Sequence, residues 1–155
     1  MHPNVVAVAE ALRAAGSAGQ VRELPGTART AALAAEQVGV DVGAIANSLL
    51  FDAGGTPLLI LTSGAHRVDT ARVERLLGIP ALNRADPEFV RRHTGQPIGG
   101  VAPLGHPEPI GTLVDIALAT FDIVWASAGH PAAVFPTTYD ELLRITAGTS
   151  AEVGD

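Results

Sequence analysis

Residues 99–107 are the stretch that most constrains the fold of this chain, because five of the nine are glycine or proline, in the order Gly-Gly-Val-Ala-Pro-Leu-Gly-His-Pro. Glycine permits backbone torsions and close approaches that a Cβ atom would forbid, whereas proline fixes φ and lacks an N–H. Such a segment specifies a backbone shape and is well suited to laying main-chain amides against a ligand. A tight turn between two strands is the alternative interpretation, since glycine and proline are the ordinary residues of loops.

The composition predicts one folded domain over residues 1–155. Hydrophobic residues make up 47% of the chain and charged residues 17%, which is enough for a real core. The absence of cysteine excludes disulfides, thiolate nucleophiles and cysteine-ligated metal sites. All ten basic residues are arginines, so mechanisms that need a lysine amine are excluded as well. The formal net charge of −6 argues against nonspecific coating of nucleic acid, and we expect no DNA partner.

The sequence also bears on where the protein acts. No apolar run approaches the ~20 residues needed to cross a bilayer, and the N-terminus lacks the basic and apolar regions of a signal peptide. We therefore expect a soluble, cytoplasmic protein with no membrane partner.

Hydrophobic periodicity and capping residues predict alternating helices and strands. The predicted helices cover residues 4–15, 27–38, 69–77, 86–93 and 140–145, and the predicted strands cover residues 21–24, 44–51, 58–61, 81–83, 112–116 and 123–126. The first helix lies within an N-terminal segment of residues 1–20, and residues 147–155 are predicted to be a tail. A hairpin turn is predicted at residues 52–55. Strands of both hairpin and crossover type indicate an α/β protein of the mixed α+β kind, with helices packed on a mixed sheet.

Several polar residues have both a structural and a functional interpretation. Ser63, His66 and Asp69 have the residue types of a hydrolytic triad, but their spacing at a strand-to-helix turn does not give the required geometry, so we expect Asp69 to be a helix cap. Asp115, in an apolar strand, is either a pocket carboxylate or the buried partner of an arginine. Trp125 is expected to pack in the core rather than to stack on a base.

The five histidines predict no metal site, because none forms a His-x-x-x-His pair or accompanies a carboxylate cluster. A phosphate-binding Gly-x-x-x-x-Gly-Lys loop is impossible without lysine. We therefore expect no metal and no other cofactor. His106, within the glycine-rich stretch, is expected to be an exposed loop histidine.

Five ordered motifs give the chain a resemblance to a known family. They are Asn-Ser-Leu-Leu-Phe at 47–51, Thr-Ser-Gly at 62–64 followed by Asp69, Asp-Pro-Glu-Phe-Val at 86–90, Thr-Gly-Gln at 94–96 leading to Gly105, and Ala-Gly-His-Pro at 128–131. Together they resemble the YbaK/EbsC family, which includes the ProX-type proteins and the editing domain of bacterial prolyl-tRNA synthetases. The resemblance runs from about Glu23 to Leu143. It implies a mixed sheet curled into a partial barrel with surrounding helices, and hydrolysis of the ester in mischarged aminoacyl-tRNA.

The resemblance also implies a set of site residues. The family's Gly-x-x-x-Pro motif falls on residues 99–103, which would lie beside the terminal adenosine and the ester, and its Gly-x-His element falls on residues 128–130. The expected catalytic residues are Asn47, Gly100 and His130, and the expected substrate-binding residues are Thr30, Ser48, Gly99, Val101, Ala102, Pro103 and Gly129. We expect a cleft between these segments. We also expect Gly100→Val to harm ligand binding more than folding, because a branched side chain would block the ligand's approach and disfavour positive φ.

One residue departs from the family pattern. Family members with editing activity generally carry a lysine where this chain has Asn47, and asparagine brings a hydrogen bond but no charge and a shorter reach. Arg29 or Arg67 could supply charge from another element. Two functions therefore remain open: a stand-alone deacylase acting on the aminoacyl-tRNA acceptor end, or a module that has lost hydrolysis and binds an aminoacyl or nucleotide ligand or a partner aminoacyl-tRNA synthetase.

Overall fold

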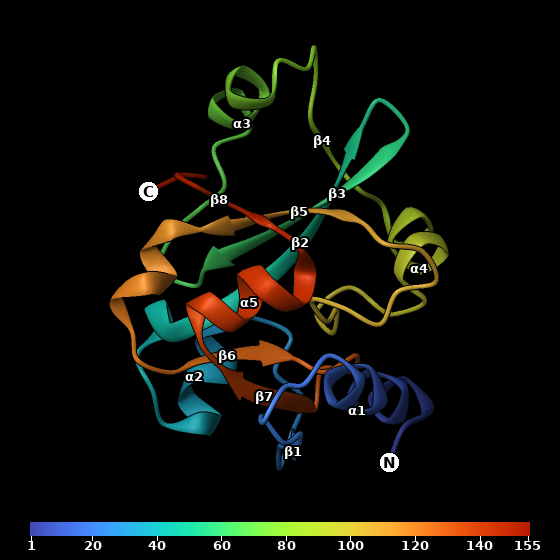
Figure 1. The fold of residues 1–155 in the computed structure, drawn as a ribbon, viewed down its shortest axis with the longest axis vertical. Coiled ribbons are helices and arrows are strands. Elements are labelled where there is room, and N and C mark those ends of the chain that lie inside the picture. The colour runs from blue at the N-terminus through green and yellow to red at the C-terminus, as the bar shows by residue number, and fades with distance from the viewer.

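A computed structural model describes residues 1–155 and contains five α-helices and eight strands (Figure 1). The helices are α1 (Pro3–Ala14), α2 (Ala31–Val38), α3 (Thr70–Leu77), α4 (Pro87–Thr94) and α5 (Tyr139–Thr146). The strands are β1 (Arg22–Glu23), β2 (Ile45–Ala53), β3 (Thr56–Ser63), β4 (Asn83–Arg84), β5 (Gly111–Asp115), β6 (Val124–Ser127), β7 (Ala133–Thr137) and β8 (Thr149–Ala151). Short 3-10 helices, η1 (Val42–Ala44) and η2 (Ile116–Thr120), precede β2 and follow β5.

The strands form one mixed, unclosed sheet in the order β1-β7-β6-β2-β3-β5-β8, with β4 paired to β2. The β2–β3 hairpin is its centre, running antiparallel from the pair Ala46 and Ser63 to the pair Ala53 and Thr56. Its turn uses Gly54 and Gly55 at φ 68° and 96°, where a side chain would be strained. β5 and β6 flank this hairpin in parallel. The predicted α/β class with a mixed sheet is therefore confirmed.

The largest core cluster joins the sheet to α1 and α5. Leu59 and Leu61 of β3 and Phe135 of β7 are fully buried, and they meet Val8 of α1 and Leu142 of α5. In Figure 1, α5 crosses the front of the sheet, while α3 stands apart at the top. Trp125 is only half-buried and packs at the edge of a smaller cluster, with the Arg22 guanidinium 5.8 Å from its ring. None of the helices combines the length and the apolar character needed to span a membrane.

Several helix boundaries follow directly from local side chains. The side chains of Asp69, Asp86 and Thr138 each accept a hydrogen bond from a backbone N–H in the first turn of α3, α4 and α5. The prediction that Asp69 is a helix cap is thus confirmed. The predicted start of α2 at Thr27 was wrong, because the cap is Thr30, whose hydroxyl accepts from the N–H of Leu33 at 3.2 Å.

Two strands differ from the sequence expectation. Residues 147–155 are not simply a tail, because β8 pairs in parallel with β5 from Leu113 and Thr149 to Asp115 and Ala151. β7 was missed, since a strand is not expected to contain proline away from an edge. β1 pairs with β7 only at Ala133 and Val134, so at Pro136 the edge of β7 that faces β1 has no strand partner. A residue without an N–H is therefore tolerated there.

Candidate functional site

The central strand β2 has a gap along one of its edges. On the edge away from β3, β2 pairs with β6 at Ile45 and Ala46 and with β4 at Phe51 and Asp52. Residues 47–50 have no strand partner on that side. Because successive residues of a strand direct their N–H and C=O groups to opposite edges, about half of these four residues present backbone polar groups to the gap. The gap follows from the topology, in which two short strands share one edge of a longer one.

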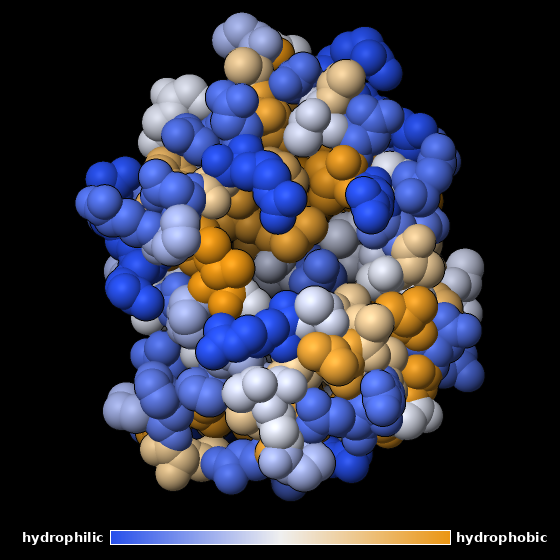
Figure 2. All heavy atoms as spheres, turned by 180° about the vertical axis from the view of Figure 1, so that it is seen from behind, coloured by the Kyte–Doolittle hydropathy of each residue, from blue (hydrophilic) through white to orange (hydrophobic).

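A cavity of about 280 Å³ lies at this gap. It is lined by residues 47–51 of β2, Arg84 and Ala85, Val90 of α4, residues 29–31 at the start of α2, and Ile98, Gly99 and Val101. Figure 2 views the molecule from the side opposite α5, where the surface is hollowed near its middle, with hydrophobic side chains at the floor and hydrophilic ones around it. Five separate segments of the chain thus converge on one mixed, concave surface, the usual form of a small-ligand site.

The cavity contains some of the predicted site residues. Thr30, Asn47, Ser48, Gly99 and Val101 all line it. The hydroxyl of Ser48 is buried and has no hydrogen-bond partner in the protein. A buried hydroxyl without a partner is costly, so a ligand group that bonded it would be favoured.

The remaining loop residues lie behind the cavity. Gly100, Ala102 and Pro103 are buried and do not line it. A Cβ atom on Gly100 would lie 2.9 Å from the Cα and C atoms of His130 and 2.8 Å from Cδ of Pro131. Gly100 therefore makes a close approach to protein, not to a ligand, and its φ is not positive. The reasoning behind the expected Gly100→Val effect was wrong, because the added side chain would clash with the fold itself.

The backbone amides of this loop divide into bonded and free groups. The N–H of Gly100 donates to the carbonyl of Pro97 at 3.0 Å, and the N–H of Ala102 donates to Oε1 of Gln96 at 2.8 Å. Gly99 and Val101 have N–H groups with no acceptor in the protein, and both residues line the cavity. An anionic or carbonyl oxygen in the cavity could therefore be bonded by two alternate amides of one loop.

Two side chains that sequence reasoning missed hold this arrangement. Gln96, only 3% exposed, takes the N–H of Ala102, and Nε2 of His106 donates to the Ala102 carbonyl at 2.8 Å. The Thr94 hydroxyl connects the end of α4 to Gln96 by accepting its backbone N–H at 3.0 Å. His106 was expected to be exposed, which was wrong: it is half-buried, and burial lowers its pKa below the ordinary 6.5. The sequence signals were that Gln96 ends the Thr-Gly-Gln motif just before the glycine-rich stretch and that His106 lies within that stretch.

His130 faces another depression. Its ring lines a surface hollow with His2, Val5 and Glu23, and its centroid is 4.9 Å from that of His2. Nδ1 of His130 accepts the N–H of Ala132 at 3.0 Å, so the neutral ring carries its proton on Nε2. The structure thus brings the backbone at His130 against Gly100 but leaves the ring outside the cavity lined by Asn47. Gly129, at φ 94°, sits beneath α1, where a Cβ atom would be 3.0 Å from the carbonyl oxygen of Asn4.

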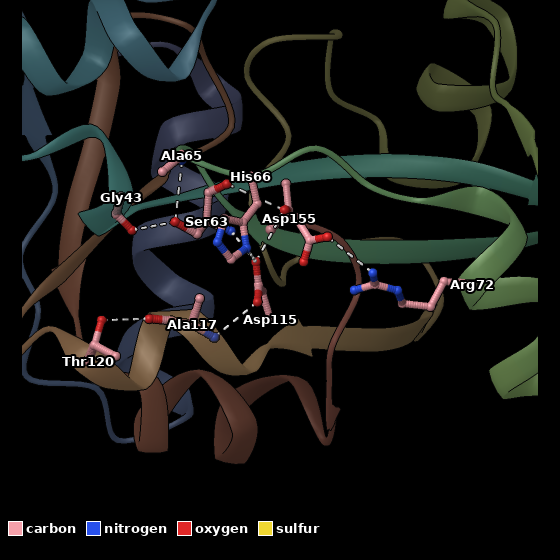
Figure 3. Close-up of polar contacts among 10 residues, drawn as sticks. Gly43, Ser63, Ala65, His66, Arg72, Asp115, Ala117, Thr120 and Asp155 are labelled. Carbon is pink, nitrogen blue, oxygen red and sulfur yellow. Dashed lines mark hydrogen bonds and ion pairs between the residues drawn. The ribbon is translucent and has the colours of Figure 1, made fainter.

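A second polar cluster lies at the C-terminal end of β3, around Ser63 (Figure 3). Asp115, 1% exposed, accepts bonds from the N–H of Ser63 at 2.9 Å and of Ala117 at 3.0 Å, and contacts Nδ1 of His66 at 3.0 Å. The Ser63 hydroxyl instead donates to the carbonyl of Gly43, so it is not aimed at His66. Asp115 is thus the buried partner of a histidine and not of an arginine. The cluster ties the ends of β3 and β5 to η2.

All the charged side chains that line the main cavity are positive. Arg29 and Arg84 are its only ionisable lining residues, and no carboxylate or histidine lines it. A cationic, partly apolar cavity with free backbone N–H groups is the kind of site that suits an oxygen-rich, anionic ligand.

The fold and this cavity therefore define a small α/β domain with a cationic cavity between a glycine-rich loop and an interrupted strand. The chain belongs to the family of aminoacyl-tRNA editing domains, whose model matches residues 26–145. It is 31% identical to the protein YwhH of Bacillus subtilis over 79% of this chain and 78% of YwhH. It is 37% identical to the proline–tRNA ligase of Geobacter sulfurreducens over 44% of this chain, but spans only 12% of that ligase. The crystal structure of a proposed trans-editing enzyme for prolyl-tRNA synthetase superposes with a TM-score of 0.94 and 40% identity, covering 100% of this chain and 99% of the other. The predicted family membership is confirmed.

Proposed function

We propose that this protein is a stand-alone aminoacyl-tRNA deacylase that hydrolyses the ester of mischarged tRNA. The aminoacylated 3′ end enters the cavity at the gap in β2. Water adds to the ester carbonyl carbon, the bond from that carbon to the ribose oxygen breaks, and the water proton passes to that oxygen. The products are a free amino acid and a tRNA with a free terminal hydroxyl.

The observation that supports this proposal is the pair of free amides on the glycine-rich loop. Gly99 and Val101 line the cavity, and their N–H groups have no acceptor in the protein, so in this proposal they bond the negative charge that develops on the ester oxygen. Removing one such donor in other hydrolases costs about 10²–10³ in rate. The side-chain amide of Asn47 can add a neutral donor from β2.

The cavity lining also bears on which group takes the proton in this proposal. No carboxylate or histidine lines the cavity, so the proposal assigns no protein side chain as general base. The neighbouring ribose hydroxyl of the substrate is left to assist the attacking water. His130 acts in this scheme only as a positioning residue, by supporting Gly100 from behind.

A binding module without hydrolysis is the second candidate, and Asn47 is the observation that favours it. The family resemblance places a lysine at this position, and an uncharged amide gives a weaker bond to an anion than an ammonium does. Such a module would hold an aminoacyl or nucleotide ligand, or assist a synthetase partner.

Release of amino acid from a panel of mischarged tRNAs tests the proposal. The panel begins with tRNA for proline, because proline–tRNA ligases are among the relatives. We expect at least one substrate to lose its amino acid well above its spontaneous rate. Binding of the acceptor end without faster release would favour the module, and neither binding nor release across the panel would overturn both candidates.

A further inference from the structure

Two arginines flank the cavity without a counter-charge. Arg29 and Arg84 take part in no ion pair and in no side-chain hydrogen bond, and no acidic residue shares their cavity. Arg72 and Arg144 are the arginines that do form ion pairs, with Asp155 and Glu141, so what distinguishes Arg29 and Arg84 is that they share one cavity. Unpaired cations around one concave surface raise the local concentration of anions. This imbalance stands out in a chain whose net charge is −6.

The two arginines belong to different elements that border the same cavity. Arg84 is in β4 and pairs with Phe51, just beyond the unpaired stretch of β2. Arg29 precedes the cap of α2, and a Cβ atom on Gly99 would lie 3.4 Å from the Cα atom of Arg29. Arg29 is therefore next to a free amide of the loop, and it lines the same cavity as Arg84.

We propose that Arg29 and Arg84 bind the phosphate group of the terminal nucleotide of the substrate, taking over the charge that Asn47 does not carry. This inference rests on the proposed function. A guanidinium offers a planar fork of donors that matches two phosphate oxygens, and it keeps its charge at any working pH. The phosphate would anchor the nucleotide at the cavity mouth and leave the ester at the amides of Gly99 and Val101.

Binding of adenosine 5′-monophosphate, adenosine and inorganic phosphate to the full chain, measured by calorimetry, tests this assignment. We expect the monophosphate to bind about tenfold more tightly than adenosine, and phosphate alone to bind far more weakly than either. Arg29→Gln and Arg84→Gln should each remove most of that tenfold advantage, and Arg→Lys should restore part of it. Arg75→Gln, an exposed change on α3 away from the cavity, is the matched control. Unchanged melting temperatures would verify that the variants fold.

The outcomes separate this inference from the deacylase proposal. If the arginine variants keep the full advantage of the monophosphate, the assignment is overturned even when the wild type deacylates tRNA. If phosphate alone binds as tightly as the monophosphate, the site holds a free anion and the assignment also fails. If the advantage depends on both arginines but no mischarged tRNA is hydrolysed, the assignment stands and the deacylase proposal fails. In an active protein, the arginine variants should raise KM by about tenfold, with a smaller effect on kcat.

Discussion

Gly100→Ala is expected to destabilise the protein by displacing the loop from its support. The new methyl carbon would lie 2.8 Å from Cδ of Pro131 and 2.9 Å from the main chain of His130, closer than carbon atoms can approach. Overpacking of this kind costs about 1–3 kcal/mol, and replacing glycine returns about 0.4–1 kcal/mol through the unfolded chain. The net loss is up to about 2.6 kcal/mol, which for this chain length is a fall in Tm of up to roughly 10 °C.

Thermal unfolding followed by circular dichroism measures this effect. Gly111→Ala is the matched control, because a Cβ atom there meets nothing within 4 Å and its φ is not positive. We expect the control to unfold at the wild-type temperature or slightly above it. Since Gly100 lies between the two free amides, ligand binding should weaken together with stability. A Gly100→Ala protein as stable as Gly111→Ala would refute the argument that the loop rests on His130 and Pro131.

Three further predictions concern the cavity and its supports. Asn47→Lys should raise deacylation about tenfold, because a charged donor bonds an anion more strongly; a folded but slower variant, measured on the same substrates, would show that the site works with an amide. Gln96→Leu should cost about 1–3 kcal/mol in chemical denaturation, since it leaves the N–H of Ala102 buried without an acceptor. Burial lowers the pKa of His106, so the unfolded chain binds a proton more readily than the folded one, and the free energy of unfolding should fall as the pH drops below about 6.5. His106→Gln keeps a donor for the Ala102 carbonyl and should reduce that pH dependence. Denaturant titrations of the wild type and the variant at pH 7.5 and pH 5 measure the effect. Equal pH dependence in the two proteins would show that the histidine is freely solvated.

The sequence by itself determined the elements whose causes are local. The caps at Asp69 and Asp86 act on N–H groups three residues away, and the glycines of the β2–β3 turn set their own torsions. The motifs around Asn47 and the glycine-rich loop were sufficient to identify the family. These features depend on residues close in the chain or on a pattern of residue types, so they can be recognised without the fold.

The tertiary structure alone decided which of these residues share a cavity and which groups remain free. The gap in β2 exists because β4 and β6, distant in sequence, both end along the same edge. The N–H groups of Gly100 and Ala102 are bonded to Pro97 and Gln96, whereas those of Gly99 and Val101 meet no acceptor in the folded chain. His130 has the expected spacing, yet its ring turns away because Ala132 donates to it and its main chain lies against Gly100. An N–H group that already donates to an acceptor in the protein is not available to a ligand. Packing between segments far apart in the chain determines which acceptor it meets.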